Sequence, residues 1–134
     1  MNRFRTFVSV HAVFLLLFGI GFLIAPNRVL ALYGAQTDPV GELASRAFAV
    51  NNIVLSVVMW IGRDHLQTRL GRGLIAALFV GNSINLLLSV QGQMNGVLSA
   101  FGWMNVILYL VFASGYGVFV YSFSKTGNGA GDAA

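Results

Sequence analysis

The chain has 134 residues, of which 57% are hydrophobic and 9% are charged, and its formal net charge is +4. Soluble domains carry about 25% charged residues, so this composition excludes an ordinary soluble domain and predicts a single domain that lies in a membrane. The net positive charge does not indicate a nucleic-acid partner, because the basic residues stand at the ends of apolar segments instead of forming one patch. Cysteine is absent, which excludes disulfides, thiol catalysis and cysteine-ligated metals.

The first predicted span follows a short basic head that carries Arg3 and Arg5. Residues Phe7 to Ala25 contain no charge, and a membrane-spanning helix needs about 20 apolar residues. A cleavable signal peptide is the alternative interpretation of a basic head followed by an apolar run. The run is longer than the roughly 7–15 residues of a signal core, so residues 7–25 are predicted to form the first transmembrane helix.

The loop after this span is predicted to contain a short helix that lies in the membrane interface. The segment Pro26–Tyr33 begins with a proline, which favours the first turn of a helix, and it is mostly apolar with a tyrosine at its end. Gly34 is expected to end this helix. The pair Asp38-Pro39 then predicts a turn before the second span.

Three further spans complete the predicted domain, and they cover residues 44–62, 73–90 and 97–123. A charged loop, residues 63–72, connects the second span to the third, and an uncharged turn, residues 91–96, connects the third to the fourth. The domain ends at residue 125. The Gly/Ala-rich tail, residues 126–134, is predicted to be flexible.

The basic residues predict the orientation of the spans. The head, the charged loop and the tail hold Arg3, Arg5, Arg63, Arg69, Arg72 and Lys125. The opposite side holds Arg28 and Arg46. The excess of basic residues on one side places both termini in the cytoplasm, which agrees with an even number of spans. The prediction is an all-α antiparallel bundle of four transmembrane helices in a bacterial cytoplasmic (inner) membrane.

Four asparagines are predicted to lie at a similar depth inside the bundle, and they are Asn51, Asn52, Asn85 and Asn105. At 1.5 Å per residue they fall roughly 10 Å below the outer surface, on three different helices. Amides inside a membrane bind neighbouring helices to one another, at about 0.5–2 kcal/mol each. The alternative is a polar pocket open to the outer leaflet, and the sequence leaves both interpretations open.

Arg46 stands a few residues inside the predicted outer boundary. Glu42 precedes it by one helical turn, so the two side chains can form an ion pair at the interface. Alternatively, Arg46 turns inward to the asparagine layer and meets an anionic or carbonyl group of a lipid, a quinone or a partner subunit. Ionisable residues in a membrane often have a function, and both interpretations stay open.

Nothing in the sequence indicates catalysis. There is no nucleophile elbow, no phosphate-binding loop and no pair of carboxylates inside a span. His11 and His65 are weak candidates for a metal or haem, because such sites need more ligands. The protein is therefore predicted to be neither an enzyme nor a metalloprotein, and no cofactor is predicted.

Small residues four positions apart recur in three spans, as Gly21 and Ala25, Ala77 and Gly81, and Ala113 and Gly117. Such pairs permit close approach between membrane helices. They predict packing within the bundle and association with other membrane subunits or with a second copy.

One stretch of the chain resembles a known group of proteins. An apolar first helix is followed by a proline, by Leu-x-Leu-Tyr-Gly at positions 30–34, and by Arg46 at the opening of the second span, with Arg63 after it. This pattern is similar to small bacterial four-helix membrane proteins of the DoxX-like kind, and the resemblance implies a four-helix bundle. The chain departs from the pattern at Asn51 and Asn52, where such proteins more often carry small apolar residues.

Two functions are compatible with these observations. The first is a non-catalytic accessory or structural subunit that packs in a larger membrane complex or a homo-oligomer. The alternative is a binder or carrier of a lipid, a quinone or a similar amphiphile. Its site would be lined by Arg46, Asn51, Asn52, Asn85 and Asn105. The lipid bilayer is a partner in either case, and nucleic acid in neither.

Overall fold

The computed structural model describes residues 2–128, with side chains as far as Phe123. The described residues form five α-helices and no strand, which confirms the predicted all-α fold. In chain order these are α1 (Asn2–Ile24), α2 (Pro26–Leu32), α3 (Pro39–Gly62), α4 (Arg69–Met94) and α5 (Gly102–Asn128). Helix α5 includes residues 126–128 of the predicted tail, and residues 129–134 of that tail lie outside the described residues.

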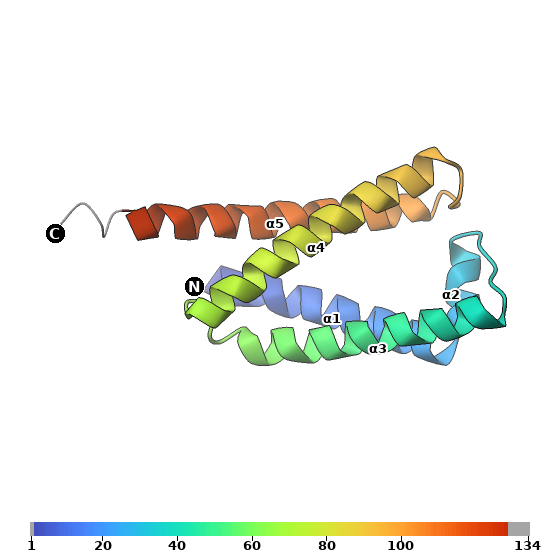
Figure 1. Ribbon diagram of the computed structural model, residues 1–134, viewed down its shortest axis with the longest axis horizontal. Helices are drawn as coiled ribbons and strands as arrows, with labels where there is room; N and C mark the ends of the chain where they lie inside the picture. The colour runs from blue at the N-terminus through green and yellow to red at the C-terminus, as the bar shows by residue number, and fades with distance from the viewer. Residues whose placement is uncertain (1, 129–134) are drawn as a thin grey trace.

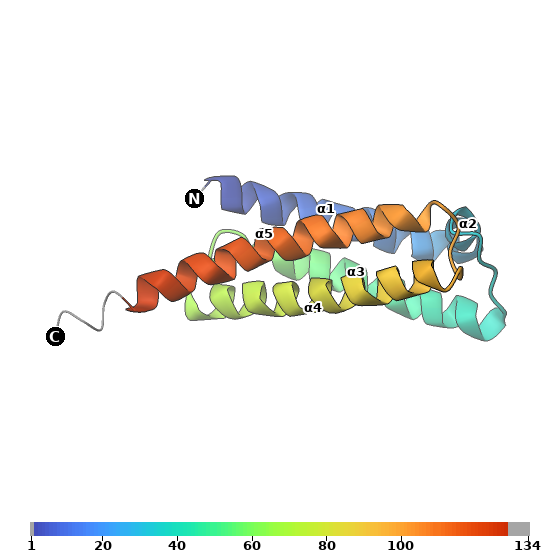
Figure 2. The same cartoon turned by 90° about the horizontal axis from the view of Figure 1, so that it is seen from above.

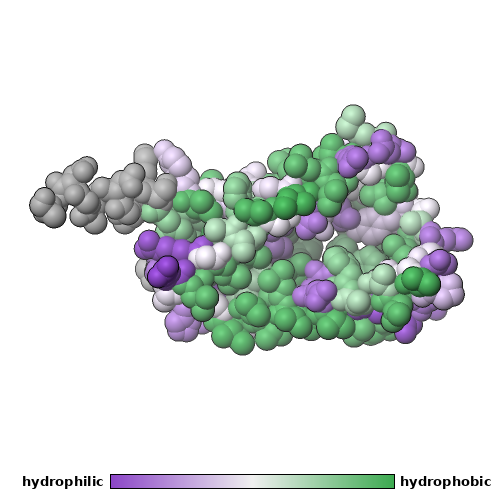
Figure 3. Space-filling model, viewed as in Figure 1, coloured by the Kyte–Doolittle hydropathy of each residue, from purple (hydrophilic) through white to green (hydrophobic). Residues whose placement is uncertain are grey.

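Four helices of the described chain are long and apolar enough to cross a membrane: α1, α3, α4 and the Gly102–Phe123 part of α5. Large apolar side chains are exposed on each of them, such as Leu17, Val54, Leu87 and Ile107. Figure 3 shows hydrophobic surface over much of the middle of the molecule. Lipid tails solvate such a surface, whereas water does not. The protein is therefore a multi-pass membrane protein, as predicted.

The second and third spans begin earlier than hydropathy predicted, because polar residues cap their helices. Asp38 accepts a hydrogen bond from the backbone N–H of Gly41 at 2.7 Å, and Pro39 occupies the first helical position of α3. Thr68 Oγ1 accepts from the N–H of Gly71 at 3.1 Å at the start of α4. Hydropathy marks the point where a helix becomes apolar, while the caps mark the point where it begins.

The fourth span begins later than predicted, at Gly102 instead of Val97. Helix α4 continues to Met94, so the loop covers residues 95–101 instead of 91–96. Two hydrogen bonds hold this loop away from a helical path: the N–H of Ser99 donates to the Tyr33 carbonyl (2.7 Å), and its hydroxyl donates to the Leu32 carbonyl (3.0 Å). The sequence could not reveal these bonds, because their partners lie in the first loop.

The spans pack as two antiparallel hairpins, α1 with α3 and α4 with α5 (Figure 1). Helices α1 and α3 approach closely at Gly19, where a Cβ atom would stand 2.6 Å from Ile53 Cγ1 and 3.0 Å from the Ala49 carbonyl. In the second hairpin, a Cβ on Gly117 would lie 3.1 Å from the ring of Phe79. Glycine therefore permits the close contact between α1 and α3, whereas at Gly117 an added Cβ would require the Phe79 ring to shift slightly.

Helix α5 passes the beginning of α1 (Figures 1 and 2), and aromatic side chains join the two hairpins there. Phe7 on α1 meets Phe112 and Tyr116 on α5 edge to face, with ring centroids 5.7 and 5.2 Å apart. The core cluster of buried residues lies mainly in this half of the molecule and contains Val8, Ala12, Met59, Leu66, Ile75, Leu78, Phe112 and Tyr116.

Helix α2 joins the hairpins at the opposite end. Gly34, with φ +75°, ends it as expected, and the N–H of Ala35 closes back on the Leu30 carbonyl at 3.0 Å. The turn brings Tyr33 under the loop between α4 and α5, where it accepts the bond from Ser99. A short helix thus occupies the predicted place, and its position at a membrane surface stays a prediction.

Candidate functional site

A cavity whose lining is mostly apolar but includes several polar side chains lies between the two hairpins. It consists of two adjoining spaces of about 270 and 50 Å3. The larger is lined mainly from α3 and α4, and the smaller mainly from α1 and α5. The residues that line both spaces are His11, Leu15, Phe48, Asn52 and Tyr109. Figure 3 shows a recess between α4 and α3 with hydrophilic surface at its edge. We call the two spaces together the central cavity.

The central cavity brings together amides from three helices. Asn52 of α3 lines both spaces, Asn82 and Asn85 of α4 line the larger, and Asn105 of α5 lines the smaller. Three of the five residues predicted for a ligand site, Asn52, Asn85 and Asn105, therefore surround one space. Asn82, which stands in the middle of the third span, joins them.

These amides do not satisfy one another. Asn52 and Asn82 each donate to the backbone carbonyl four residues earlier, that of Phe48 (3.1 Å) and that of Leu78 (2.7 Å). Among the described residues, no hydrogen bond joins two of the asparagine side chains in this cavity, and the side-chain oxygens of Asn52 and Asn82 accept none. The amides thus keep hydrogen-bonding capacity that is directed at the cavity instead of at a neighbouring helix.

Asn105 is oriented by a residue outside the spans. The hydroxyl of Tyr33, which is 4% exposed, donates to Asn105 Oδ1 at 2.9 Å. Burial raises the pKa of Tyr33, so the hydroxyl keeps its proton and remains the donor. With its oxygen held in this way, the amide nitrogen of Asn105 is left as a donor for the cavity.

His11 contributes a ring nitrogen to the same space. It is 4% exposed, stacks on Phe112 with ring centroids 3.8 Å apart, and contacts the hydroxyl of Tyr116 through Nδ1 at 2.8 Å. If Nδ1 carried the proton, the hydroxyl proton of the fully buried Tyr116 would have no acceptor among the described residues. The hydroxyl therefore donates to Nδ1, and Nε2–H is the free donor of His11.

Sequence reasoning did not assign His11 or Tyr109 to the site. The predicted span begins at Phe7, which puts His11 close to its end, but α1 begins at Asn2. His11 therefore lies roughly 14 Å along the helix at 1.5 Å per residue. The signal that could have revealed it is an ionisable side chain within an apolar run. Tyr109 follows Asn105 by four residues, a spacing that places the two side chains on one helix face.

The structure does not bring Arg46 or Asn51 to the cavity. Arg46 Nη2 pairs with Glu42 Oε1 at 2.7 Å, and Glu42 Oε2 accepts a further bond from Asn27 at 3.0 Å. This is the interfacial pair of the first interpretation. Asn51 is exposed on the outer face of α3, because successive helix residues are rotated by about 100° and only Asn52 turns inward.

The pair Ala77 and Gly81, predicted to pack helices together, lines the larger space of the cavity instead. A Cβ atom on Gly81 would meet no atom within 4 Å outside its own helix turn. Ala77 and Gly81 are four residues apart, as in helix-packing pairs, but here their small side chains leave room for the cavity.

The lining of the central cavity carries histidine, amide and phenol groups but no side chain of Asp, Glu, Lys or Arg among the described residues. No group of three or more His, Cys, Asp or Glu side chains within residues 2–128 is placed to hold a metal ion. His65 lies apart from His11, on the groove between α3 and α4. The cavity therefore offers hydrogen bonds without a fixed charge.

Comparison of the chain with models of protein families, with curated proteins and with solved structures found no match. The resemblance to DoxX-like proteins accordingly stays a prediction. Any function assigned to the protein rests on the chemistry of the cavity.

Proposed function

We propose that the protein binds or carries an uncharged amphiphile of the lipid or quinone class, with the head group in the central cavity. The observation that carries the proposal is that His11, Asn52 and Tyr109, from three helices, face one space without pairing with one another. A polar group without a partner in the hydrocarbon region costs several kcal/mol. A ligand oxygen that accepts from these groups would remove that cost. The proposed role is non-catalytic.

The residues that line the central cavity also favour a ligand with a neutral, hydrogen-bond-accepting head group. Free donors from His11 and the amides suit carbonyl or ester oxygens, and the absence of charged lining residues favours a neutral head group. Phe14, Phe18 and Leu108 line the smaller space and offer apolar contacts to a tail. A volume of about 270 Å3 is close to the lower limit of roughly 300–1,000 Å3 for ligand pockets. This volume suits the head group of an amphiphile, while the tail of the ligand stays in the lipid.

The decisive test fills the larger space of the cavity. Gly81→Leu places a side chain in that space, and Gly73→Leu is the matched control, because Gly73 also lies on α4 with no atom within 4 Å of an added Cβ but does not line the cavity. The probes are a benzoquinone with a short isoprenoid tail and a diacylglycerol, added to the purified full-length protein. Binding is measured by native mass spectrometry.

We expect Gly81→Leu to weaken the binding of the better probe by about tenfold or more, which corresponds to about 1.4 kcal/mol. Gly73→Leu should bind as the wild type does. If the wild type retains neither probe, or if both variants bind equally, the proposal is wrong.

A second candidate function is the accessory or structural subunit. The observation in its favour is an apolar groove of about 880 Å3 between the end of α3 and the start of α4, lined by Val58, Ile61, Leu74 and Ala77 among others. A helix of a partner subunit would cover it. Native mass spectrometry in mild detergent tests this, because a protein that is monomeric and free of other subunits would argue against it.

We also propose that both termini face the cytoplasm of a bacterial cell. Five arginines stand at the end where α1 and α4 begin and α3 ends, and these are Arg3, Arg5, Arg63, Arg69 and Arg72. Arg28 and Arg46 stand towards the other end. The distribution supports this orientation through the positive-inside rule, and the bacterial membrane follows from the resemblance alone.

A further inference from the structure

A second groove lies on the outside of the first hairpin, at the arginine-rich end. It has a volume of about 410 Å3 and is separate from the central cavity, although Phe14 contacts both. Its polar end is formed by Arg5, Thr6, Ser9 and Arg63. Its apolar part runs along α1 and is formed by Val10, Val13, Phe14 and Leu17, with Trp60 of α3 as a further wall.

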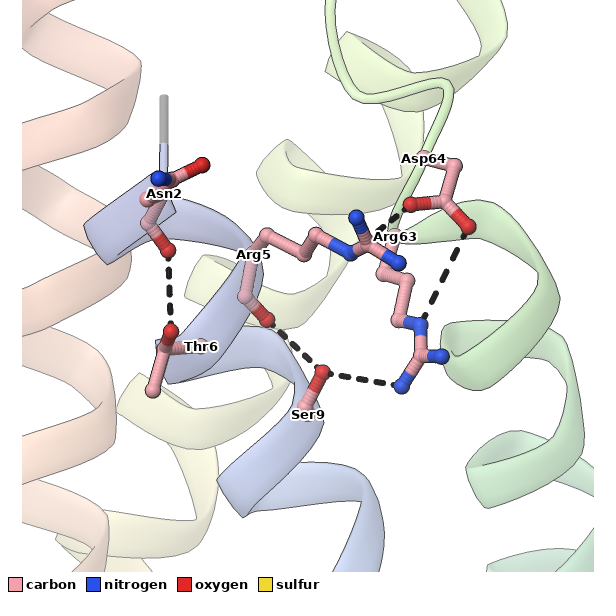
Figure 4. Close-up of polar contacts among 6 residues, drawn as sticks. All are labelled: Asn2, Arg5, Thr6, Ser9, Arg63 and Asp64. Carbon is pink, nitrogen blue, oxygen red and sulfur yellow. Dashed lines mark hydrogen bonds and ion pairs between the residues drawn. The ribbon is translucent and has the colours of Figure 1, made fainter.

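The guanidinium of Arg63 is held at the polar end with most of its hydrogen-bonding capacity unused. It lies over the ring of Trp60, with Cζ 3.7 Å from the ring centroid, and Nη1 donates to Ser9 Oγ at 3.3 Å (Figure 4). Its Nε is buried and has no hydrogen-bond partner. Asp64 Oδ2 lies 3.9 Å from Nε, which is a long ion pair and too distant for a hydrogen bond (Figure 4).

Among the described residues, Asp64 supplies the carboxylate for both arginines at this end of the groove. Asp64 Oδ1 pairs with Arg5 Nε at 2.8 Å (Figure 4). Ser9 Oγ donates to the Arg5 carbonyl at 2.8 Å, so towards Arg63 it is an acceptor without charge. Two guanidinium groups thus share one carboxylate, so the described residues at this end of the groove carry a net positive charge.

We propose that this groove binds an anionic phospholipid, with the phosphate against Arg63 and Arg5 and an acyl chain along α1. A phosphate accepts hydrogen bonds from the planar guanidinium through its Nη groups, of which Nη1 also contacts Ser9. From Ser9 to Leu17 the groove follows α1 for roughly 12 Å at 1.5 Å per residue. That length is close to the roughly 15 Å depth of one leaflet of the hydrocarbon core.

A lipid fits this groove better than free phosphate does. Val10, Val13 and Leu17 line most of its length and offer nothing to an inorganic ion. They are 46%, 43% and 62% exposed, so an acyl chain can reach them. The site would therefore belong to the leaflet on the side of the arginine-rich end.

The experiment compares phosphatidylglycerol with phosphatidylcholine of the same acyl chains, each added to the purified full-length protein and followed by native mass spectrometry. We expect the wild type to prefer phosphatidylglycerol by about tenfold. Arg63→Gln should abolish the preference. Arg69→Gln, the matched control, removes an equal charge at the same end without touching the groove and should keep it.

A second pair of variants leaves every charge in place and remains informative if Arg63→Gln fails to fold. Val13→Trp blocks the apolar part of the groove, and Val57→Trp adds the same side chain at a similarly exposed position on α3 outside it. The preference should be lost only in Val13→Trp. In a further arm, millimolar inorganic phosphate should not displace the lipid.

Four results would overturn the proposal. One is equal binding of the two lipids by the wild type. Another is an equal loss in Arg63→Gln and Arg69→Gln, which would indicate general attraction of the arginine-rich end. The third is an equal effect of the two tryptophans. The last is displacement by inorganic phosphate, which would make this a site for the free anion.

Discussion

Asn82 and Tyr33 show two different ways in which a buried polar side chain is satisfied in this bundle. Tyr33 finds its partner on another element, Asn105 of α5, and so links a loop to a span. Asn82 donates only to Leu78, within its own helix. The first bond holds the fold together, whereas the second leaves the amide oxygen turned to the cavity with no partner. Asn105 therefore links two elements, as the first interpretation of the asparagines predicts, whereas a polar site stays a proposal.

Replacing Asn82 by leucine separates these two roles. Because the Asn82 side chain makes no bond to another helix, Asn82→Leu should leave the protein without ligand as stable as the wild type or more stable, by up to about 1 kcal/mol. Asn105→Leu loses the bond from Tyr33 and should destabilise it by about 0.5–2 kcal/mol. Unfolding of both variants in mixed detergent measures the difference. A marked loss of stability in Asn82→Leu would mean that the amide holds helices together after all.

The individual helices illustrate what hydropathy does and does not predict. Each of the four spans was located, because a long apolar run leaves a helix as the only backbone that can lie in lipid. Helix ends depended on local capping at Asp38 and Thr68, and the start of α5 depended on bonds from Ser99 to a distant loop. The close contact between α1 and α3 at Gly19 was not predicted, because its opposing residue on α3 cannot be identified from one helix alone.

The contact at Gly19 should be the most sensitive position of the first hairpin. A methyl group there would stand 3.0 Å from the Ala49 carbonyl, and backbone cannot turn aside as a side chain can. We expect Gly19→Ala to destabilise the protein by about 1–3 kcal/mol. Gly73→Ala, where the added methyl meets open space, should be neutral or stabilising by up to about 1 kcal/mol. Thermal unfolding in detergent tests this pair, and equal melting temperatures would contradict the expected crossing of α1 and α3.

For the molecule as a whole, counting residues along the spans predicts a similar depth for Asn52, Asn85 and Asn105, since all helices rise by the same amount per residue. All three line the central cavity. Counting could not show which way each side chain points. Asn51 and Asn52 are adjacent in sequence, yet one faces outward and the other lines the cavity. The direction of the Arg46 side chain likewise follows from its ion pair with Glu42 and not from its depth in the membrane.

Labelling of introduced cysteines can test the orientation in the membrane, because the chain contains no cysteine of its own that would react. Gln67→Cys, in the exposed loop after α3, should be protected from a membrane-impermeant maleimide in intact cells and react after lysis. Gln36→Cys, in the exposed loop before α3, should react in intact cells. The opposite pattern would place the arginine-rich end outside and reverse the proposed topology.

The pairing of α1 with α3 and of α4 with α5 has a consequence for how the chain is assembled. Each half is a helical hairpin with its own internal contact, at Gly19 in one and at Gly117 in the other. Membrane helices insert first and associate afterwards, so each hairpin has what it needs to form before the halves dock. The protein resembles two subunits joined by the short connection at residues 63–68. A gene split between Gln67 and Thr68 would still encode both hairpins complete.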